Sequence, residues 1–173
     1  KEVDEAFEKA FDLSPERKML ARANECIKEG QFEEAEKLCR QVIKKNPDNV
    51  DAIRFMGRLA ARLNRVGEAE RQYRKVLDIV PDFTAVIVDL GRLLQEDDRI
   101  EESINFFKQA IKMEPGNAAF YDLLGNALAH AALTYEAIEA HQKAIELDPG
   151  SEAAWLGLGH TLKTVGRQEE AIE

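Results

Sequence analysis

A proline recurs every 34 residues along most of this chain, at Pro47, Pro81, Pro115 and Pro149. A fixed period in the range of about 20 to 50 residues is typical of repeat architectures, and 34 residues make one helix–turn–helix unit. Because proline cannot continue a helix, each one marks the end of a repeat. We therefore divide the chain into repeats at 16–49, 50–83, 84–117 and 118–151, followed by a partial repeat at 152–173.

The apolar residues of each repeat follow a helical spacing. Positions 4, 7, 8 and 11 of a repeat form one stripe of a helix with 3.6 residues per turn, which we call helix A. Positions 20, 24 and 27 continue the pattern in a second helix, helix B. Position 4 holds Met19, Ile53, Ile87, Tyr121 and Trp155. The chain is therefore predicted to be all-α, with paired helices stacked into an α-solenoid.

Small residues recur at two further positions. Position 8 holds Ala23, Gly57, Gly91, Gly125 and Gly159, and position 20 holds Ala35, Ala69, Ser103, Ala137 and Ala171. Glycine inside a helix costs about 1 kcal/mol relative to alanine, so its recurrence needs a compensating reason. We expect helix A to be pressed against helix B where these two positions meet.

The turn between the two helices also repeats. Position 15 holds residue types that tolerate a left-handed backbone: Gly30, Asn64, Asp98 and Gly166. Ala132 occupies the same position in the fourth repeat and tolerates that conformation poorly. The sequence therefore predicts a distorted or strained turn there.

Composition limits the classes of partner. The net charge of −9 argues against nucleic-acid binding, which relies on a basic field. No apolar run approaches the roughly 20 residues that cross a bilayer, so we expect a cytoplasmic protein that does not bind membranes. Cys26 and Cys39 are too few for a disulfide-built domain, and we expect buried free thiols. Since the chain begins at Lys1 and stops at Glu173 within a repeat, we expect a piece of a longer protein.

Residues 16–173 resemble the tetratricopeptide repeat family, whose motif reads W-x2-L-G-x2-Y, then A-x3-F, then P. The fifth repeat carries Trp155, Leu158 and Gly159 of this motif, and the third carries its proline and aromatic residues. The resemblance implies a right-handed superhelix with a concave groove lined by helix A. Repeat positions 2, 5, 9, 12 and 13 face the groove in this family, and we call them the helix-A face.

The helix-A face supplies the candidate binding residues. The resemblance predicts a protein- or peptide-binding scaffold with no catalytic residue, metal or cofactor of its own. Hydrogen-bonding and charged side chains on this face suit an extended peptide, whose backbone groups need partners. The candidates for peptide binding are Asn24, Lys28, Arg54, Arg58, Arg62, Arg92, Asn126, His130 and His160.

Arg54, Arg58 and Arg62 share one side of the predicted helix A of the second repeat, and Arg92 follows one repeat later. Guanidinium groups bind carboxylate or phosphate in bidentate fashion, so an acidic segment is a candidate ligand. A solvated face paired with neighbouring carboxylates is the alternative. His130 and His160 lack the additional ligands of a zinc site. His141 fills an aromatic core position, and we expect it to be packed and neutral.

Three further expectations concern the ends of the chain. Residues 1–15 form an N-terminal helix, either a cap or the remnant of a preceding repeat. The partial repeat leaves an apolar edge that favours weak self-association. The segment from Trp155 to Gln168 resembles repeats that precede the catalytic domain of bacterial sulfotransferases. The alternative function is therefore the substrate- or partner-recruiting region of a larger transferase, a sulfotransferase or, next, a glycosyltransferase.

Overall fold

The computed structural model describes residues 15–166, which contain the helices α2 to α10 and no strand. Apart from Pro15, the N-terminal helix predicted over 1–15 lies outside the described residues, as does the end of the partial repeat. The chain divides into an N-terminal unit, residues 1–81, and a C-terminal unit, residues 82–173. Each unit is described by itself, and the division into 34-residue repeats remains a prediction that we use for numbering.

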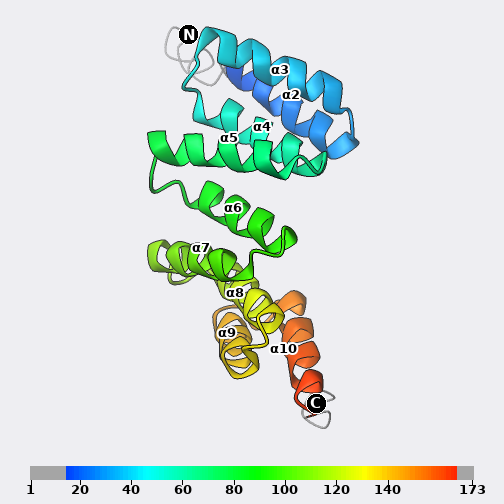
Figure 1. The fold of residues 1–173 in the computed structure, drawn as a ribbon, viewed down its shortest axis with the longest axis vertical. Helices are drawn as coiled ribbons and strands as arrows, with labels where there is room; N and C mark the ends of the chain where they lie inside the picture. Colours follow the sequence, from blue (N-terminus) through cyan, green and yellow to red (C-terminus); the bar gives the residue numbers. More distant parts are fainter. Residues whose placement is uncertain (1–14, 167–173) are drawn as a thin grey trace, which may run out of the picture. The chain divides into compact units, whose positions relative to one another are not determined.

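The N-terminal unit consists of two helix pairs (Figure 1). The first pair is α2 (Pro15–Glu29) and α3 (Phe32–Lys45), and the second is α4 (Val50–Arg62) and α5 (Val66–Ile79). Helix α4 also packs against α2 and α3. The core between α2, α3 and α4 combines short side chains, among them Ala23, Cys26 and Cys39, with longer ones such as Leu20 and Met56.

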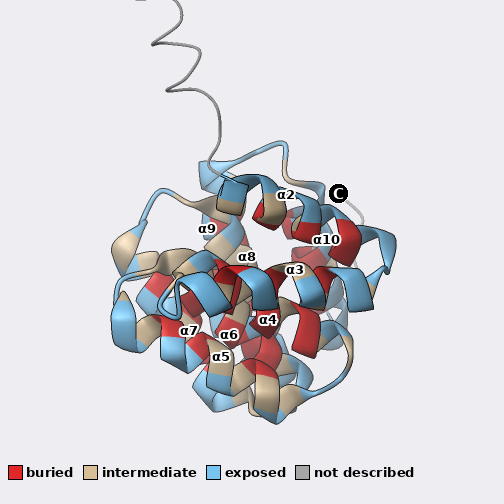
Figure 2. Ribbon diagram, turned by 90° about the horizontal axis from the view of Figure 1, so that it is seen from above, coloured by how far each residue is buried: buried red, intermediate tan, exposed pale blue. Residues whose placement is uncertain are grey.

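The C-terminal unit continues the same pairing. Helices α6 (Thr84–Glu96) and α7 (Ile100–Met113) form one pair, and α8 (Ala118–His130) and α9 (Thr134–Leu147) form the next. Helix α10 (Glu152–Thr164) packs against both α8 and α9. In both units the buried residues lie where paired helices meet, and the exposed residues lie on the outer sides (Figure 2).

The period of the prolines explains where helix B ends. The residue before each proline is Asn46, Val80, Glu114 or Asp148, and all have φ between −131° and −139°. A residue that precedes proline is forced out of the helical region because the proline ring clashes with its backbone. The repeated proline therefore ends helix B, whose last helical residue lies two residues before the proline.

The turn between helix A and helix B has one geometry throughout. Gly30, Asn64, Asp98, Ala132 and Gly166 all have positive φ, between 56° and 77°. In the fourth repeat the amide of Leu133 donates to the Leu128 carbonyl at 2.9 Å, and the corresponding amides in the first three repeats do the same. This is the Schellman arrangement that closes a helix C-terminus. The turn at Ala132 is not distorted; the alanine adopts the left-handed conformation with φ 59° and bears the strain.

The recurring glycines face an aromatic ring rather than another small residue. A Cβ atom placed on Gly57 would lie 2.6 Å from Cε1 of Tyr73, and one on Gly91 would lie 2.7 Å from Cε1 of Phe107. Both rings occupy repeat position 24, whereas we expected position 20 to be the nearest neighbour. The prediction of close approach is correct, but its partner was wrong: the glycine makes room for the ring of helix B.

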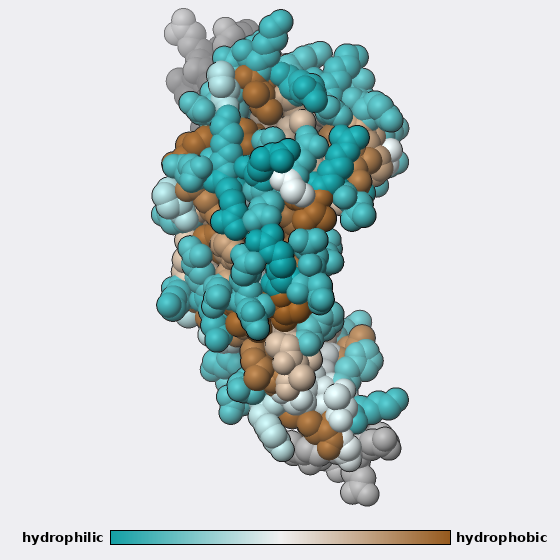
Figure 3. Space-filling model, viewed as in Figure 1, coloured by the Kyte–Doolittle hydropathy of each residue, from teal (hydrophilic) through white to brown (hydrophobic). Residues whose placement is uncertain are grey.

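Burial at position 4 of the predicted stripe differs between the repeats. Ile53 and Ile87 are buried at position 4, whereas Trp155 is 53% exposed at that position, so its predicted place in the core was wrong. The indole Nε1 of Trp155 instead donates to the Pro149 carbonyl at 3.0 Å. Hydrophilic residues cover most of the N-terminal unit in Figure 3, whereas apolar residues are more frequent in the lower part of the C-terminal unit. None of the helices within residues 15–166 has the length and apolar character needed to span a bilayer.

Candidate functional site

The helix-A face of the N-terminal unit carries positive side chains on α2 and α4. Asn24 and Lys28 lie on α2, and Arg54, Arg58 and Arg62 follow one another at every fourth residue of α4. Asn24, Arg54 and Arg58 are half-buried, while Lys28 and Arg62 are exposed. All five predicted residues of this unit are therefore at its surface, and residues four apart on a helix share one side.

Arg58 is held in place from two sides. Its Nη1 atom donates to the Oδ1 atom of Asn24 at 3.0 Å, which joins α4 to α2 across one repeat length. The centre of its guanidinium lies 5.7 Å from the centroid of the Phe55 ring, a cation–π contact. Within residues 15–166 no other group binds Arg58, so one edge of the guanidinium stays available to a ligand.

Lys28 and Arg62 occupy the same repeat position on neighbouring helices, at the C-terminal ends of α2 and α4. Neither side chain has a hydrogen-bond or ion-pair partner in the part of the chain that the structure describes. Arg54, by contrast, is already engaged by another group. Of the other positive side chains on this face of α2 and α4, Arg54 therefore has a partner, whereas Lys28 and Arg62 are solvated.

The helix-A face of the C-terminal unit has a different composition. Arg92 lies on α6, His130 and Asn126 lie on α8, and His160 lies on α10, all of them exposed or half-buried. The Nδ2 atom of Asn126 donates to the Oδ2 atom of Asp122 at 3.4 Å. Asp122 is at repeat position 5, the position of Arg54 on α4, so the two units present opposite charges at equivalent places.

Asp122 also binds the most deeply buried polar ring of the described residues. The Nδ1 atom of His141 lies 3.1 Å from Oδ1 of Asp122, and the His141 side chain is completely buried. Because an ionised carboxylate only accepts hydrogen bonds, Nδ1 carries the hydrogen and donates it. The other ring nitrogen, Nε2, is buried without a partner within residues 15–166. The expectation that His141 is packed in the core is confirmed.

Two glycines enclose the His141 ring. A Cβ on Gly125 of α8 would lie 2.7 Å from Cε1 of the imidazole, and a Cβ on Gly157 of α10 would also collide with it. Helices α8 and α10 therefore both approach the ring closely. This enclosure fixes the ring and aims Nδ1 at the carboxylate.

The remaining candidate chemistry of the described residues is inert. Cys26 and Cys39 are both buried and free, as predicted. Burial raises the pKa of the Cys39 thiol to about 11, with the nearby Glu36 carboxylate adding to the effect. No cluster of three or more metal-ligating side chains occurs within residues 15–166, and His130 and His160 belong to no such cluster.

Sequence reasoning missed two residues that contact the candidate residues: Phe55, at repeat position 6, and Asp122, at position 5 of the helix-A face. Asp122 could have been found from the sequence, because repeat position 5 belongs to the helix-A face. The residues Asp122, Asn126 and His130 occupy the same repeat positions as Arg54, Arg58 and Arg62. The signal for Phe55 was only its place three residues before Arg58 on one helix, which brings a ring under a guanidinium.

Comparison with known proteins identifies the family. A tetratricopeptide repeat model matches residues 27–86 and, in an overlapping second match, residues 64–127, which together make up more than half of the chain. The chain belongs to the tetratricopeptide repeat family. No curated protein matches it.

Solved tetratricopeptide-type structures share the fold. MamA from Desulfovibrio magneticus RS-1, residues 41 to the end, superposes with a TM-score of 0.80 at 22% identity, over 92% of this chain and 90% of that chain. TTC0263, a thermophilic tetratricopeptide repeat protein of Thermus thermophilus, gives 0.73 at 18% identity, over 90% and 86% of the two chains. The all-α solenoid is thereby confirmed, and a solenoid of tetratricopeptide repeats is a scaffold for protein interaction rather than an enzyme fold.

Proposed function

We propose that the protein is a peptide-binding scaffold whose N-terminal unit binds an acidic segment of a protein partner at Arg58. The observation that carries this proposal is the fixation of Arg58 by Asn24 and Phe55. A side chain held before the ligand arrives loses less conformational entropy on binding. Lys28 and Arg62, which are without partners among residues 15–166, add positive charge beside it.

The chemistry favours a carboxylate-bearing ligand. Arg58 uses one N–H for Asn24, and its remaining N–H groups form the planar fork that matches two carboxylate oxygens. The net charge of the chain is −9, which by itself would attract basic partners. The positive side chains of this face repel such partners locally and so favour an acidic segment here. An extended peptide would place successive acidic side chains along α4.

The test uses fluorescein-labelled octaglutamate as the probe, with affinity measured by fluorescence anisotropy at several salt concentrations. We expect the double variant Arg58→Ala/Arg62→Ala to bind about tenfold more weakly and with a shallower salt dependence. The control Lys44→Ala/Arg71→Ala removes the same charge from exposed positions on α3 and α5. Its affinity should change less than about twofold.

Arg58→Lys sharpens the test because it keeps the charge but loses the planar fork. We expect this variant to resemble Arg58→Ala more than the unaltered protein. Equal losses in the double variant and in its control would mean that octaglutamate responds only to net charge. That result would refute the assignment of the site to Arg58.

A further inference from the structure

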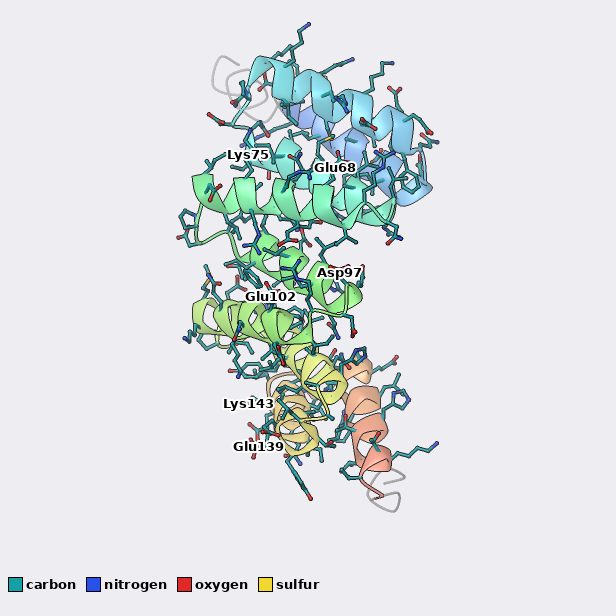
Figure 4. All side chains as sticks on the ribbon, in the orientation of Figure 1. Glu68, Lys75, Asp97, Glu102, Glu139 and Lys143 are labelled. Atoms are coloured by element: carbon teal, nitrogen blue, oxygen red, sulfur yellow. The ribbon has the colours of Figure 1, made fainter. Side chains whose placement is uncertain are left out.

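Several arginines of the N-terminal unit are paired with a carboxylate of the same unit. Arg22, Arg40, Arg65 and Arg74 each form an ion pair with a glutamate three or four residues away, at 2.6 to 3.8 Å. Glu68, the partner of Arg65, lies in the first turn of α5 (Figure 4). Residues at this spacing are neighbours on a helix, so the sequence itself supplies these partners.

The sequence supplies no such carboxylate to Arg58 and Arg62. Apart from each other, the residues three and four positions away from them are Arg54, Phe55, Leu59, Ala61, Arg65 and Val66. Like charges four residues apart on a helix repel, so the row of arginines destabilises α4. Carboxylates are not scarce, because the chain has 33 Asp and Glu against 24 Lys and Arg. A bound anion would remove the repulsion that the chain leaves in place here.

Lys28 brings a third cation to the same place. Helices α2 and α4 run in the same direction, because α3 reverses the chain between them (Figure 1). The bond between Asn24 and Arg58 joins the two helices at repeat position 9. Lys28 and Arg62 both lie four residues further on, about 6 Å along the helix. Three cations without a carboxylate partner among residues 15–166 therefore lie within one helical turn on two adjacent helices.

We propose that the acidic segment bound by this face carries a phosphorylated serine or threonine, whose phosphoryl group lies between Arg58, Lys28 and Arg62. The proposal rests on the proposed function and names the group that the same site recognises. A carboxylate has one charge and two oxygens, whereas a phosphate monoester has a charge of about −1.5 to −2 at neutral pH and three acceptor oxygens. Three cations around one position match the phosphate better than a single carboxylate.

The three side chains bind the phosphoryl group in two ways. Nη1 of Arg58 donates to Asn24, which leaves Nε and Nη2 as the fork for two phosphate oxygens. Phe55 covers one face of the guanidinium, so the ligand binds at this edge. Lys28 and Arg62 are exposed and donate to the remaining oxygen from the next turn of each helix. The fixed arginine thus orients the group, and the two exposed cations complete the neutralisation of its charge.

Lys28 and Arg62 also have a structural role that the test must separate from binding. Both lie in the last turn of their helices, where a cation interacts favourably with the partial negative charge of the helix end. Lys44 has the same role in α3, and Arg71 is an exposed arginine of α5. Neither has a partner in the described part of the chain. Lys44→Ala and Arg71→Ala are therefore matched controls for Lys28→Ala and Arg62→Ala.

The experiment uses the whole chain and three fluorescein-labelled peptides, with affinities measured by fluorescence anisotropy in about 150 mM salt, where exposed charges are screened. The first peptide has a phosphoserine between two pairs of glutamates. The second has an unmodified serine at that place. The third has two glutamates there, which matches the charge of the phosphorylated peptide. Circular dichroism checks that each variant is folded.

We expect the phosphorylated peptide to bind about tenfold more tightly than the charge-matched glutamate peptide. Lys28→Ala and Arg62→Ala should each lower this preference about fivefold, whereas Lys44→Ala and Arg71→Ala should change it less than about twofold. Arg58→Ala should weaken the binding of all three peptides. Unlabelled phosphorylated peptide should displace the probe at a far lower concentration than inorganic phosphate does.

Equal affinities for the phosphorylated and the charge-matched peptide would overturn the proposal. Equal losses of preference in Lys28→Ala and Lys44→Ala would overturn the placement of the phosphoryl group. Displacement by inorganic phosphate as effective as that by the unlabelled peptide would assign the site to the free ion and not to a protein partner. Failure of the proposed function is distinguishable from these results, because octaglutamate would then bind independently of Arg58.

Discussion

The pair α4–α5 in the N-terminal unit and the pair α8–α9 in the C-terminal unit share a frame but differ in chemistry. Each has a glycine on helix A facing a ring on helix B, Gly57 with Tyr73 and Gly125 with His141. On the helix-A face the first pair carries three arginines, and the second carries Asp122, Asn126 and His130.

The difference lies in how the face is connected to the core. In α8–α9 the buried ring donates to a residue of the helix-A face, since His141 binds Asp122. In α4–α5 the contacts that hold Arg58 come from other residues outside the core: Asn24 of the neighbouring helix pair and Phe55 of the same helix. The scaffold therefore supports its binding residues in two ways, one through the core and one across adjacent helices.

The largest expected effect comes from the glycines that both pairs share. Gly57→Ala and Gly125→Ala each place a Cβ under 3 Å from a buried ring, which forces the helices apart. We expect each to lower the free energy of unfolding by about 1–3 kcal/mol, measured by urea denaturation. Gly67→Ala is the control, because no atom lies within 4 Å of its added Cβ. Stability unchanged in Gly57→Ala and Gly125→Ala would show that the rings move aside freely.

Exchanging the rings tests whether only one pair accepts a buried imidazole. Tyr73→His places a histidine at the position equivalent to His141. Repeat position 5 holds Arg54 in this repeat and not an aspartate, so the new ring has no carboxylate acceptor there. We expect a loss of about 2 kcal/mol at pH 7.5 from the unsatisfied buried group, and a larger loss at pH 5.5. His141→Tyr should change stability by less, since Asn126 still binds Asp122. Equal losses in both variants would refute a special role of Asp122 in accommodating His141.

The smallest effect concerns the turns of the same two pairs. Ala132→Gly removes a Cβ from a left-handed position with φ 59°, and we expect a gain of about 0.5–1 kcal/mol in the free energy of unfolding. Asn64→Ala places an alanine in the same left-handed conformation, at φ 56°. It should therefore lower the free energy of unfolding by a similar amount. A destabilised Ala132→Gly would mean that the alanine methyl group makes a packing contact that outweighs the backbone strain.

Periodicity predicted most of the scaffold, because helix ends and turns are decided by local residue types. Pro47 and its equivalents fix the ends of helix B, and position 15 fixes the left-handed turn even at Ala132. Contacts between helices were harder to predict. That Gly57 faces Tyr73 rather than Ala69 depends on the crossing of α4 and α5, which no single-helix pattern contains.

The candidate site was predicted as a set of positions rather than as contacts. The sequence identified Arg58 and Asn24 on one face, but their bond at 3.0 Å depends on how α2 and α4 are stacked. Asp122 was overlooked because its importance comes from His141, a core residue 19 positions later in the chain. The exposed Trp155 was assigned to the core because the pattern cannot show whether a neighbouring helix covers it.

The turn amides offer a way to observe the molecule opening. Gln31, Arg65, Arg99 and Leu133 each donate their amide hydrogen to a carbonyl five residues earlier, at 2.8 to 2.9 Å. Each such hydrogen exchanges with solvent only when the turn between its own helix A and helix B comes apart. Four backbone signals, spaced 34 residues apart, thereby report separately on four helix pairs. Their exchange rates would rank the pairs by local stability without any substitution or label.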